Sequence, residues 1–213
     1  KNDLLTVTIE DMGHDGEGIG KCDGYTVFVK DAVIGDTVRM KLMKTRKNFG
    51  YGRLMEILTP SPDRTEAPCP FARPCGGCQI QALSYEKQLE FKARKIRNNL
   101  KRIGGFADEE ISMEPVIGME HPFGYRNKAQ FPVGTDREGR LVTGFYAGRT
   151  HSIIPNRKCL LGVPVNETIL DTVLDFMEEF GVTAYQEDTG KGLVRHVLIR
   201  YGFHTGQVMV CLV

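Results

Sequence analysis

The chain has 213 residues, which is enough for one large domain or two small ones. Its 41% apolar and 26% charged residues are an ordinary globular composition, and the net charge of +1 indicates little by itself. No apolar run approaches the roughly 20 residues of a membrane span, and the N-terminus lacks a signal peptide's apolar region. We therefore expect no membrane partner, a cytoplasmic location, and six cysteines that are ligands or thiols rather than disulfides.

Short segments with alternating polar and apolar residues follow one another through residues 1–60. The strand signals are Val7–Ile9, Tyr25–Val29, Thr37–Leu42 and Tyr51–Leu58. Between the first two, Gly13–Gly20 contains four glycines in eight residues, but neither a Lys-Ser/Thr pair nor a helix follows it. We interpret this stretch as a tight connection between strands. Strands this short and evenly spaced predict a small closed β-barrel.

A basic segment, Lys41–Arg53, lies within the predicted barrel. It carries five cations, two aromatic residues and no acid. Cations can contact phosphates and exposed aromatic rings can stack on bases, so this combination is typical of single-stranded RNA binding. The predicted RNA contacts in the barrel are Lys44, Arg46, Lys47, Phe49 and Tyr51. The alternative is a solvated hairpin whose aromatic residues pack inward, and a barrel host favours RNA over it.

The order of these signals also resembles a known domain. The pattern from Val7 through the glycines of Gly13–Gly20 to Phe28-Val29 and Gly35-Asp36 resembles a TRAM domain, an OB-like barrel found on RNA-modifying enzymes. Thr59–Pro62 then forms a stiff linker. We therefore predict a TRAM-like RNA-binding domain over residues 1–60 and a second domain over residues 61–213.

Three cysteines lie close together after the linker, and a fourth lies far downstream. Their spacing is Cys69-x5-Cys75-x2-Cys78, with Cys159 as the remote member. Structural zinc sites usually pair two short hairpins of ligands, whereas three clustered cysteines and one remote cysteine resemble iron–sulfur ligation. A redox Cys75–Cys78 pair needs a helix that starts at its first cysteine, which Gly76-Gly77 disfavours. The spacing therefore favours an iron–sulfur cluster, then zinc, then a redox pair.

A basic helix is predicted from the N-cap Ser84 to Gly104. The residues expected to face inward recur at helical spacing: Tyr85, Leu89, Ile96, Leu100 and Ile103. The other face holds seven cations against Glu86 and Glu90. We interpret this face first as a solvated surface, with a phosphate-binding surface as the alternative.

The remainder of the chain predicts an α+β domain with an antiparallel sheet and flanking helices. Strands are expected at Tyr125–Val133, Leu141–Tyr146, His151–Ile154, Leu193–Arg200 and Gln207–Val213, and a helix from the cap Asn166 to Gly181. Cys22 and Cys211 are interpreted as small buried apolar residues. His196 is expected to be packed within its strand rather than catalytic.

The cysteine pattern resembles a particular enzyme family. Cys-x5-Cys-Gly-Gly-Cys-Gln before a basic helix resembles the RNA uracil-5 methyltransferases that carry a [4Fe–4S] cluster, and Pro155–Leu161 matches the turn at their fourth ligand. The resemblance covers the whole chain. It implies a cluster held by Cys69, Cys75, Cys78 and Cys159. It also places Arg126 and Lys128 on the RNA-binding side, although these charges suit a protected sheet edge almost equally well.

The resemblance also implies what this chain does not contain. No βαβ alternation or glycine-rich strand–turn–helix offers a site for S-adenosylmethionine, so no residue here is predicted to be catalytic. We expect a monomeric N-terminal and central-domain fragment, inactive alone, of an S-adenosylmethionine-dependent enzyme that methylates C5 of uridine in RNA, with 23S ribosomal RNA favoured over transfer RNA. The alternatives are a non-enzymatic RNA-binding protein with a structural zinc and a redox iron–sulfur protein.

Overall fold

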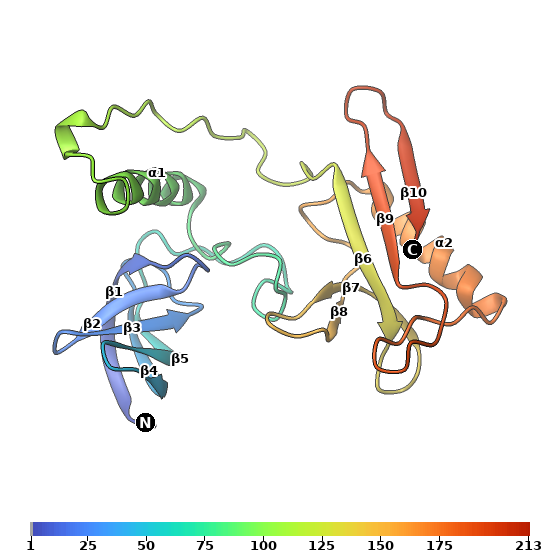
Figure 1. The fold of residues 1–213 in the computed structure, drawn as a ribbon, viewed down its shortest axis with the longest axis horizontal. Helices are drawn as coiled ribbons and strands as arrows, with labels where there is room; N and C mark the ends of the chain where they lie inside the picture. The colour runs from blue at the N-terminus through green and yellow to red at the C-terminus, as the bar shows by residue number, and fades with distance from the viewer. Residues whose placement is uncertain (1) are drawn as a thin grey trace. The chain divides into compact units, whose positions relative to one another are not determined.

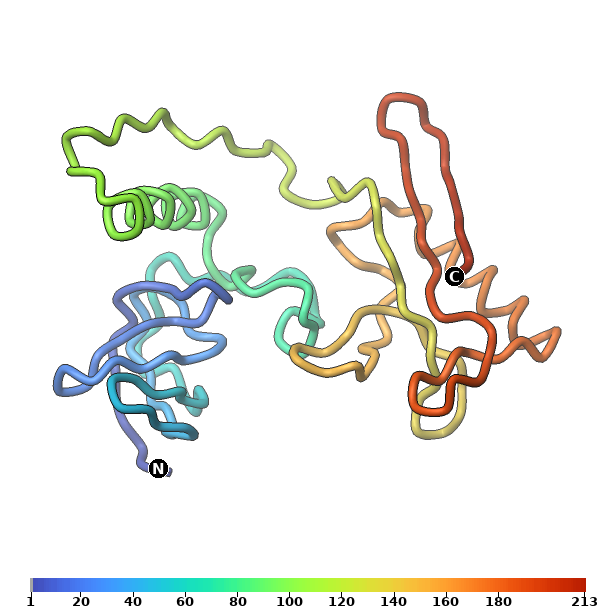
Figure 2. Tube along the Cα trace, viewed as in Figure 1, coloured from blue at the N-terminus to red at the C-terminus, as the bar shows by residue number. Residues whose placement is uncertain are grey.

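The computed structural model describes residues 2–213 (Figures 1 and 2). The chain divides by spatial proximity into two units, each described separately below. Unit 1 comprises Lys1–Pro68 and Cys78–Gly118, and unit 2 comprises Cys69–Gly77 and Met119–Val213. The division into domains after residue 60 stays a prediction from the sequence. Within residues 2–213, no helix is long and apolar enough to cross a membrane.

The first part of unit 1 is a closed barrel, as predicted (Figure 1). Its strands are β1 (Leu4–Met12), β2 (Gly18–Cys22), β3 (Tyr25–Lys30), β4 (Thr37–Thr45) and β5 (Phe49–Thr59). They close in the order β1-β2-β3-β5-β4. The pairs are antiparallel except for β3 and β5, which run parallel.

The barrel core follows the alternation in the sequence. Every second residue of the strands points inward, which buries Val7, Ile9, Val27, Val29, Val38 and Met40. The glycine-rich stretch was only partly predicted, because its second half is not a connection but strand β2. A Cβ atom on Gly20 would lie 2.4 Å from the Thr8 carbonyl oxygen and 2.5 Å from Val7 Cγ2. Glycine here therefore allows two strands to approach closely.

The linker after the barrel is fixed to it by a buried ion pair. Asp36 is completely buried, and its carboxylate accepts hydrogen bonds from the Val33 and Ser61 amides at 2.8 and 2.9 Å. Arg64 donates to the same carboxylate from Nε at 3.0 Å and Nη2 at 2.7 Å. Residues 61–64 are therefore held against the barrel by this one side chain.

Helix α1 (Tyr85–Arg102) begins at the predicted cap, because the Ser84 side chain accepts from the Lys87 amide at 3.4 Å. The prediction of its buried face was only partly correct, because Tyr85, Leu89 and Leu100 are half-buried and none of the five predicted residues is fully buried. Phe91 is its buried residue, in a cluster with Met12, Val33 and Leu83. Ile96 and Ile103 are 54% and 83% exposed. The apolar periodicity identified the helix but not the side that packs on the barrel.

The cations of α1 largely have partners within unit 1. Arg94 binds Asp11 at 3.0 Å, and Lys95 Nζ lies 2.9 Å from His14 Nδ1. Arg97 and Lys101 both bind Asp108, in the short helix η1 (Asp108–Glu110). These contacts fix the helix and the following turn, so much of this charge is paired within unit 1 rather than simply solvated.

Unit 2 contains the predicted antiparallel sheet. Its strands are β6 (Lys128–Thr135), β7 (Leu141–Tyr146), β8 (Ile153–Pro155), β9 (His196–Tyr201) and β10 (Val208–Leu212), in the order β10-β9-β6-β7-β8. The helix α2 (Val165–Glu179) covers one face (Figure 1). Its buried residues Leu170, Leu174 and Met177 pack with Phe131 and Ile199 in the core. The fold class is therefore confirmed.

Two details of unit 2 differ from the prediction. Pro164 occupies the N-cap position of α2, so Asn166 is not the cap but lies within the first turn. The Asn166 side chain is buried there. Cys211 is exposed rather than buried, because it lies on the edge strand β10, where every residue is exposed. His196 is half-buried, as expected, and burial together with Arg195 lowers its pKa.

Candidate functional site

The predicted RNA contacts of the barrel come together on the β4–β5 hairpin. Lys44 lies near the end of β4, and Arg46 and Lys47 lie in the turn. All three are exposed, and in the described part of the chain none forms an ion pair. Many cations elsewhere in the chain have a carboxylate partner. Positive charge is therefore available to an anionic ligand at this hairpin.

The hairpin turn is held in place by a side chain that the sequence did not single out. The Tyr25 hydroxyl donates to the Arg46 carbonyl oxygen at 2.8 Å and contacts the Phe49 carbonyl oxygen. The Arg46 amide lies 3.3 Å from the same hydroxyl. Tyr25 therefore binds both sides of the turn, and its aromatic ring packs against the barrel core.

An aromatic cluster lies beside the hairpin. Phe49 and Tyr51 of β5 meet Phe28 of β3, and the three ring centroids are 5.5–5.7 Å apart. All three rings are half-buried, so part of each remains open to solvent. Rings of this kind can stack on nucleobases. Phe28 was not predicted, although its place between the inward-facing Val27 and Val29 already indicated an outward side chain.

The predicted contacts of unit 2 lie at the start of β6. Arg126 is half-buried, and its amide donates to the Leu161 carbonyl oxygen at 2.9 Å. This bond ties Arg126 to the loop that follows Cys159. Lys128 is exposed and pairs in register with Arg200 of β9. In the described residues, neither Arg126 nor Lys128 forms an ion pair.

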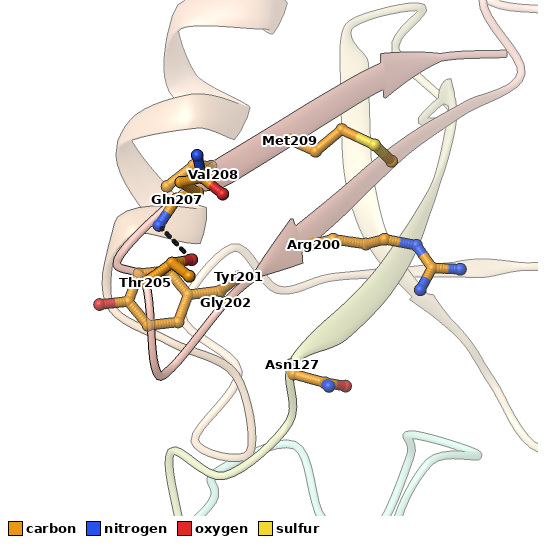
Figure 3. Close-up of a pocket in the computed structure, with 8 residues that line it drawn as sticks. All are labelled: Asn127, Arg200, Tyr201, Gly202, Thr205, Gln207, Val208 and Met209. Atoms are coloured by element: carbon orange, nitrogen blue, oxygen red, sulfur yellow. Dashed lines mark hydrogen bonds between the residues drawn. The ribbon is translucent and has the colours of Figure 1, made fainter.

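An open pocket of about 550 Å³ lies at the start of β6, where Asn127 lines it (Figure 3). Its lining residues come from the start of β6 and from the β9–β10 hairpin: Asn127, Arg200, Tyr201, Gly202, Thr205, Gln207, Val208 and Met209. Figure 3 shows Asn127, Arg200 and Met209 projecting to the same side of the hairpin. The sequence predicted contacts at Arg126 and Lys128, on either side of Asn127, but not the part contributed by β9 and β10.

A charged cluster near β7 was also not predicted. His151 Nδ1 lies 2.6 Å from Glu187 Oε2, and Arg195 donates to Glu187 Oε1 at 2.8 Å. Hydrogen bonds from His151 and Arg195 hold the pKa of Glu187 below its usual range. The Tyr146 ring stacks on His151. These contacts join the segment of Tyr146 and His151 to that of Glu187 and Arg195, so we interpret them as a brace between two loops.

The loop that carries the first cysteines packs against β7. The backbone of Cys75 forms an isolated antiparallel β-bridge with Ala147. The Gly76 amide donates to the Tyr146 carbonyl oxygen at 2.9 Å. A Cβ atom on Gly76 would lie 3.0 Å from that oxygen, which is tighter than an ordinary van der Waals contact, so glycine suits this approach. The Gly77 amide also donates to Cys75 Sγ at 3.4 Å.

The structure does not bring the four predicted ligands together as a metal site. Cys69, Cys75 and Cys159 lie in unit 2, and Cys78 is grouped with unit 1. All four are half-buried. Among residues 2–213, no group of three or more Cys, His, Asp or Glu side chains is placed to hold a metal ion. Ligation by these cysteines therefore stays a prediction from their spacing and chemistry.

Comparison with known proteins identifies the barrel. Residues 2–55 match the TRAM domain family. Along all 213 residues the chain is 46% identical to an uncharacterized RNA methyltransferase of Bacillus cereus, 46% to one of Clostridium acetobutylicum and 41% to one of Listeria monocytogenes. The chain covers 46% of each of these proteins and so spans about half their length.

A solved structure supports the fold. The chain aligns with the crystal structure of Pyrococcus abyssi tRNA (uracil-54, C5)-methyltransferase in complex with S-adenosyl-L-homocysteine, with a TM-score of 0.67. The alignment covers 97% of this chain and 45% of the archaeal protein, at 24% identity. At this identity, the likeness establishes the arrangement of the elements alone.

Proposed function

We propose that these 213 residues are the RNA-recognition part of an RNA methyltransferase that acts on C5 of uridine. The observation that carries this proposal is the TRAM barrel, whose exposed hairpin cations have no carboxylate partner among residues 2–213 and lie beside an open aromatic cluster. Relatives along the whole chain that are named RNA methyltransferases support the reaction class. The uracil-5 specificity is supported by the cysteine pattern of the sequence.

We assign methyl transfer to a domain outside these residues. In the part that the structure describes, the sheets are a small barrel and an antiparallel sheet, and neither has the parallel doubly wound form that binds S-adenosylmethionine in the resembling enzymes. The named relatives are about twice as long as this chain. S-adenosylmethionine is therefore proposed as the cofactor of the complete enzyme, and these residues alone are expected to be inactive.

The proposed substrate is 23S ribosomal RNA, so the role would be in ribosomal RNA processing. Its support is the combination of a TRAM barrel with the four cysteines, which resembles the ribosomal branch of the family. Transfer RNA is the competing substrate. Methylation by the complete enzyme of 23S ribosomal RNA and of transfer RNA, each transcribed without modifications, separates the two. Methyl transfer to transfer RNA alone would contradict the ribosomal assignment.

We also propose that Cys69, Cys75, Cys78 and Cys159 hold a [4Fe–4S] cluster. Thiolates are the ligands such clusters use. The Gly77 amide donates to Cys75 Sγ, a contact that a ligand sulfur can accept. The cluster would connect the cysteine loop to the loop after Cys159, whose backbone is hydrogen-bonded to Arg126. Its proposed role is structural.

Titration of a fluorescent 12-nucleotide oligouridylate at several salt concentrations tests RNA recognition. Lys44, Arg46 and Lys47 are changed together to Gln. The expected result is weaker binding and a salt slope that falls by about 2, because each lost contact to single-stranded RNA contributes about 0.7. The matched control changes Lys92, Arg102 and Arg137 to Gln, three exposed cations without ion pairs in the described residues. Equal losses in both variants would refute a specific hairpin contact.

A further inference from the structure

One face of the unit 2 sheet carries a row of side chains across three strands. Arg200 of β9 pairs in register with Lys128 of β6 on one side and Met209 of β10 on the other. Cross-strand partners project from the same face of a sheet. The residue before Arg200 in β9, Ile199, is buried in the core with α2, so this row lies on the face that α2 leaves uncovered.

The charges of this row are not compensated. Four other cations of unit 2 bind acids: Arg140 binds Asp136, Arg157 binds Asp171, Lys158 binds Glu167 and Arg195 binds Glu187. Lys128 and Arg200 are exposed, and within residues 2–213 neither forms an ion pair. Two adjacent cations without acids complement a phosphate group.

The pocket beside these cations offers two further kinds of contact. Met209 is 48% exposed and supplies apolar surface, and the exposed Asn127 carboxamide forms no hydrogen bond with other described residues. Figure 3 shows both on the same side of the hairpin as Arg200. A carboxamide can donate to and accept from a base edge. The volume of about 550 Å³ lies within the range of small-ligand sites.

The backbone around the pocket is fixed. The Tyr201 amide donates to the Asn127 carbonyl oxygen at 2.8 Å, which joins the start of β6 to the end of β9. The turn that follows is closed by the Gly202 amide, which donates to the Gln207 carbonyl oxygen at 2.9 Å. A site whose walls are already ordered loses less conformational entropy on binding.

We propose that this pocket binds one nucleotide of single-stranded RNA. Arg200 and Lys128 contact its phosphate, the base lies against Met209, and Asn127 reads a base edge. This inference rests on the proposed function and adds a second RNA site in unit 2. Charge favours RNA over a protein partner on this face, because the cations lie here. The apolar Val210 and Leu212 of β10, which could attract a protein, pair with the core residues Ile199 and Val197 and so belong to the α2 side.

The cations are tested with the same oligouridylate and the whole chain. Arg200→Gln and Lys128→Gln should each weaken binding about fivefold and lower the salt slope by about 0.7. Arg137→Gln is the matched control. It removes one exposed cation, without an ion pair in the described residues, from the turn beyond the far end of β6, and it should change neither quantity.

The base contacts are tested separately. Asn127→Ala and Met209→Ala should weaken binding but leave the salt slope unchanged, because neither side chain is charged. An oligonucleotide with 4-thiouridine should cross-link to a peptide that contains Met209. Circular dichroism of each variant verifies that its fold is retained.

The outcomes distinguish this site from the barrel function. If the hairpin variant loses affinity but Arg200→Gln and Lys128→Gln behave like Arg137→Gln, the pocket proposal is wrong and the barrel proposal stands. This result would leave the face open to a protein partner. If the unmodified chain does not bind the oligonucleotide even at low salt, the proposed function fails as well.

Discussion

At the scale of single residues, Asp36 links the barrel to the segment that follows it. Burial alone would raise the pKa of this carboxyl group, but hydrogen bonds from Arg64 and from the Ser61 and Val33 amides outweigh burial and lower the pKa. Gly35-Asp36 contributed to the resemblance found in the sequence. The ion-pair partner of Asp36 could not be identified from the sequence, because Arg64 is 28 residues away and no local pattern relates the two positions.

Asp36→Asn is expected to destabilise unit 1. The change leaves the Arg64 guanidinium, on a side chain that is only 19% exposed, without its counter-charge, which should cost about 3 kcal/mol. Urea unfolding followed by circular dichroism measures this loss. The control is Arg39→Ala, which breaks an exposed pair with Glu56 and should cost less than about 1 kcal/mol. A similar loss in both variants would show that the buried pair has no special role.

The same carboxyl group predicts the direction of a pH effect. A carboxyl pKa that is lower in the folded state stabilises the fold above the unfolded value of about 3.9. That contribution should disappear as the pH falls below about 4 and through the folded pKa. The difference in unfolding free energy between the unmodified chain and Asp36→Asn should therefore shrink from pH 7 to pH 3. A constant difference would argue against the charged pair.

At the scale of secondary-structure elements, the alternation of polar and apolar residues predicted most strands, and helical spacing and capping residues predicted both long helices. It failed where a partner element decides the outcome. Strand β2 was read as part of a connection, because Gly18 and Gly20 lack the side chains that signal a strand. The buried side of α1 was also only partly predicted, because Phe91 is selected by the barrel surface rather than by the apolar period of the helix.

Gly20→Ala tests the close packing of β1 and β2. Its Cβ atom would meet the Thr8 backbone oxygen at 2.4 Å, which a flexible side chain cannot relieve, so we expect a loss of about 3 kcal/mol. Gly24→Ala is the control, since no atom lies within 4 Å of its Cβ position and only its φ of +80° opposes the change. This strain should cost about 1 kcal/mol. Thermal and urea unfolding compare the two, and an equal loss would contradict the packing argument.

At the scale of the whole molecule, the fold class was readable because both units are built from local patterns. The candidate sites were readable only in part. Their residues come from segments distant in sequence, as when Asn127 meets Arg200 and Met209 in one pocket. The hairpin cations were found because they are adjacent in sequence. Phe28 reaches the same site through the parallel pairing of β3 and β5, which the sequence did not reveal.

The predicted cysteine ligands come from two distant parts of the chain, the segment Cys69–Cys78 and the single Cys159. Protein purified without oxygen should contain iron and acid-labile sulfide, and Cys75→Ser should remove most of both, because serine oxygen is a poor ligand for this cluster. Cys211→Ser and Cys22→Ser are matched controls, since neither residue belongs to the predicted set. Both should keep the metal content of the unmodified protein. Stoichiometric zinc without sulfide would instead support the structural zinc alternative, and equal iron loss in Cys211→Ser would contradict the assigned ligands.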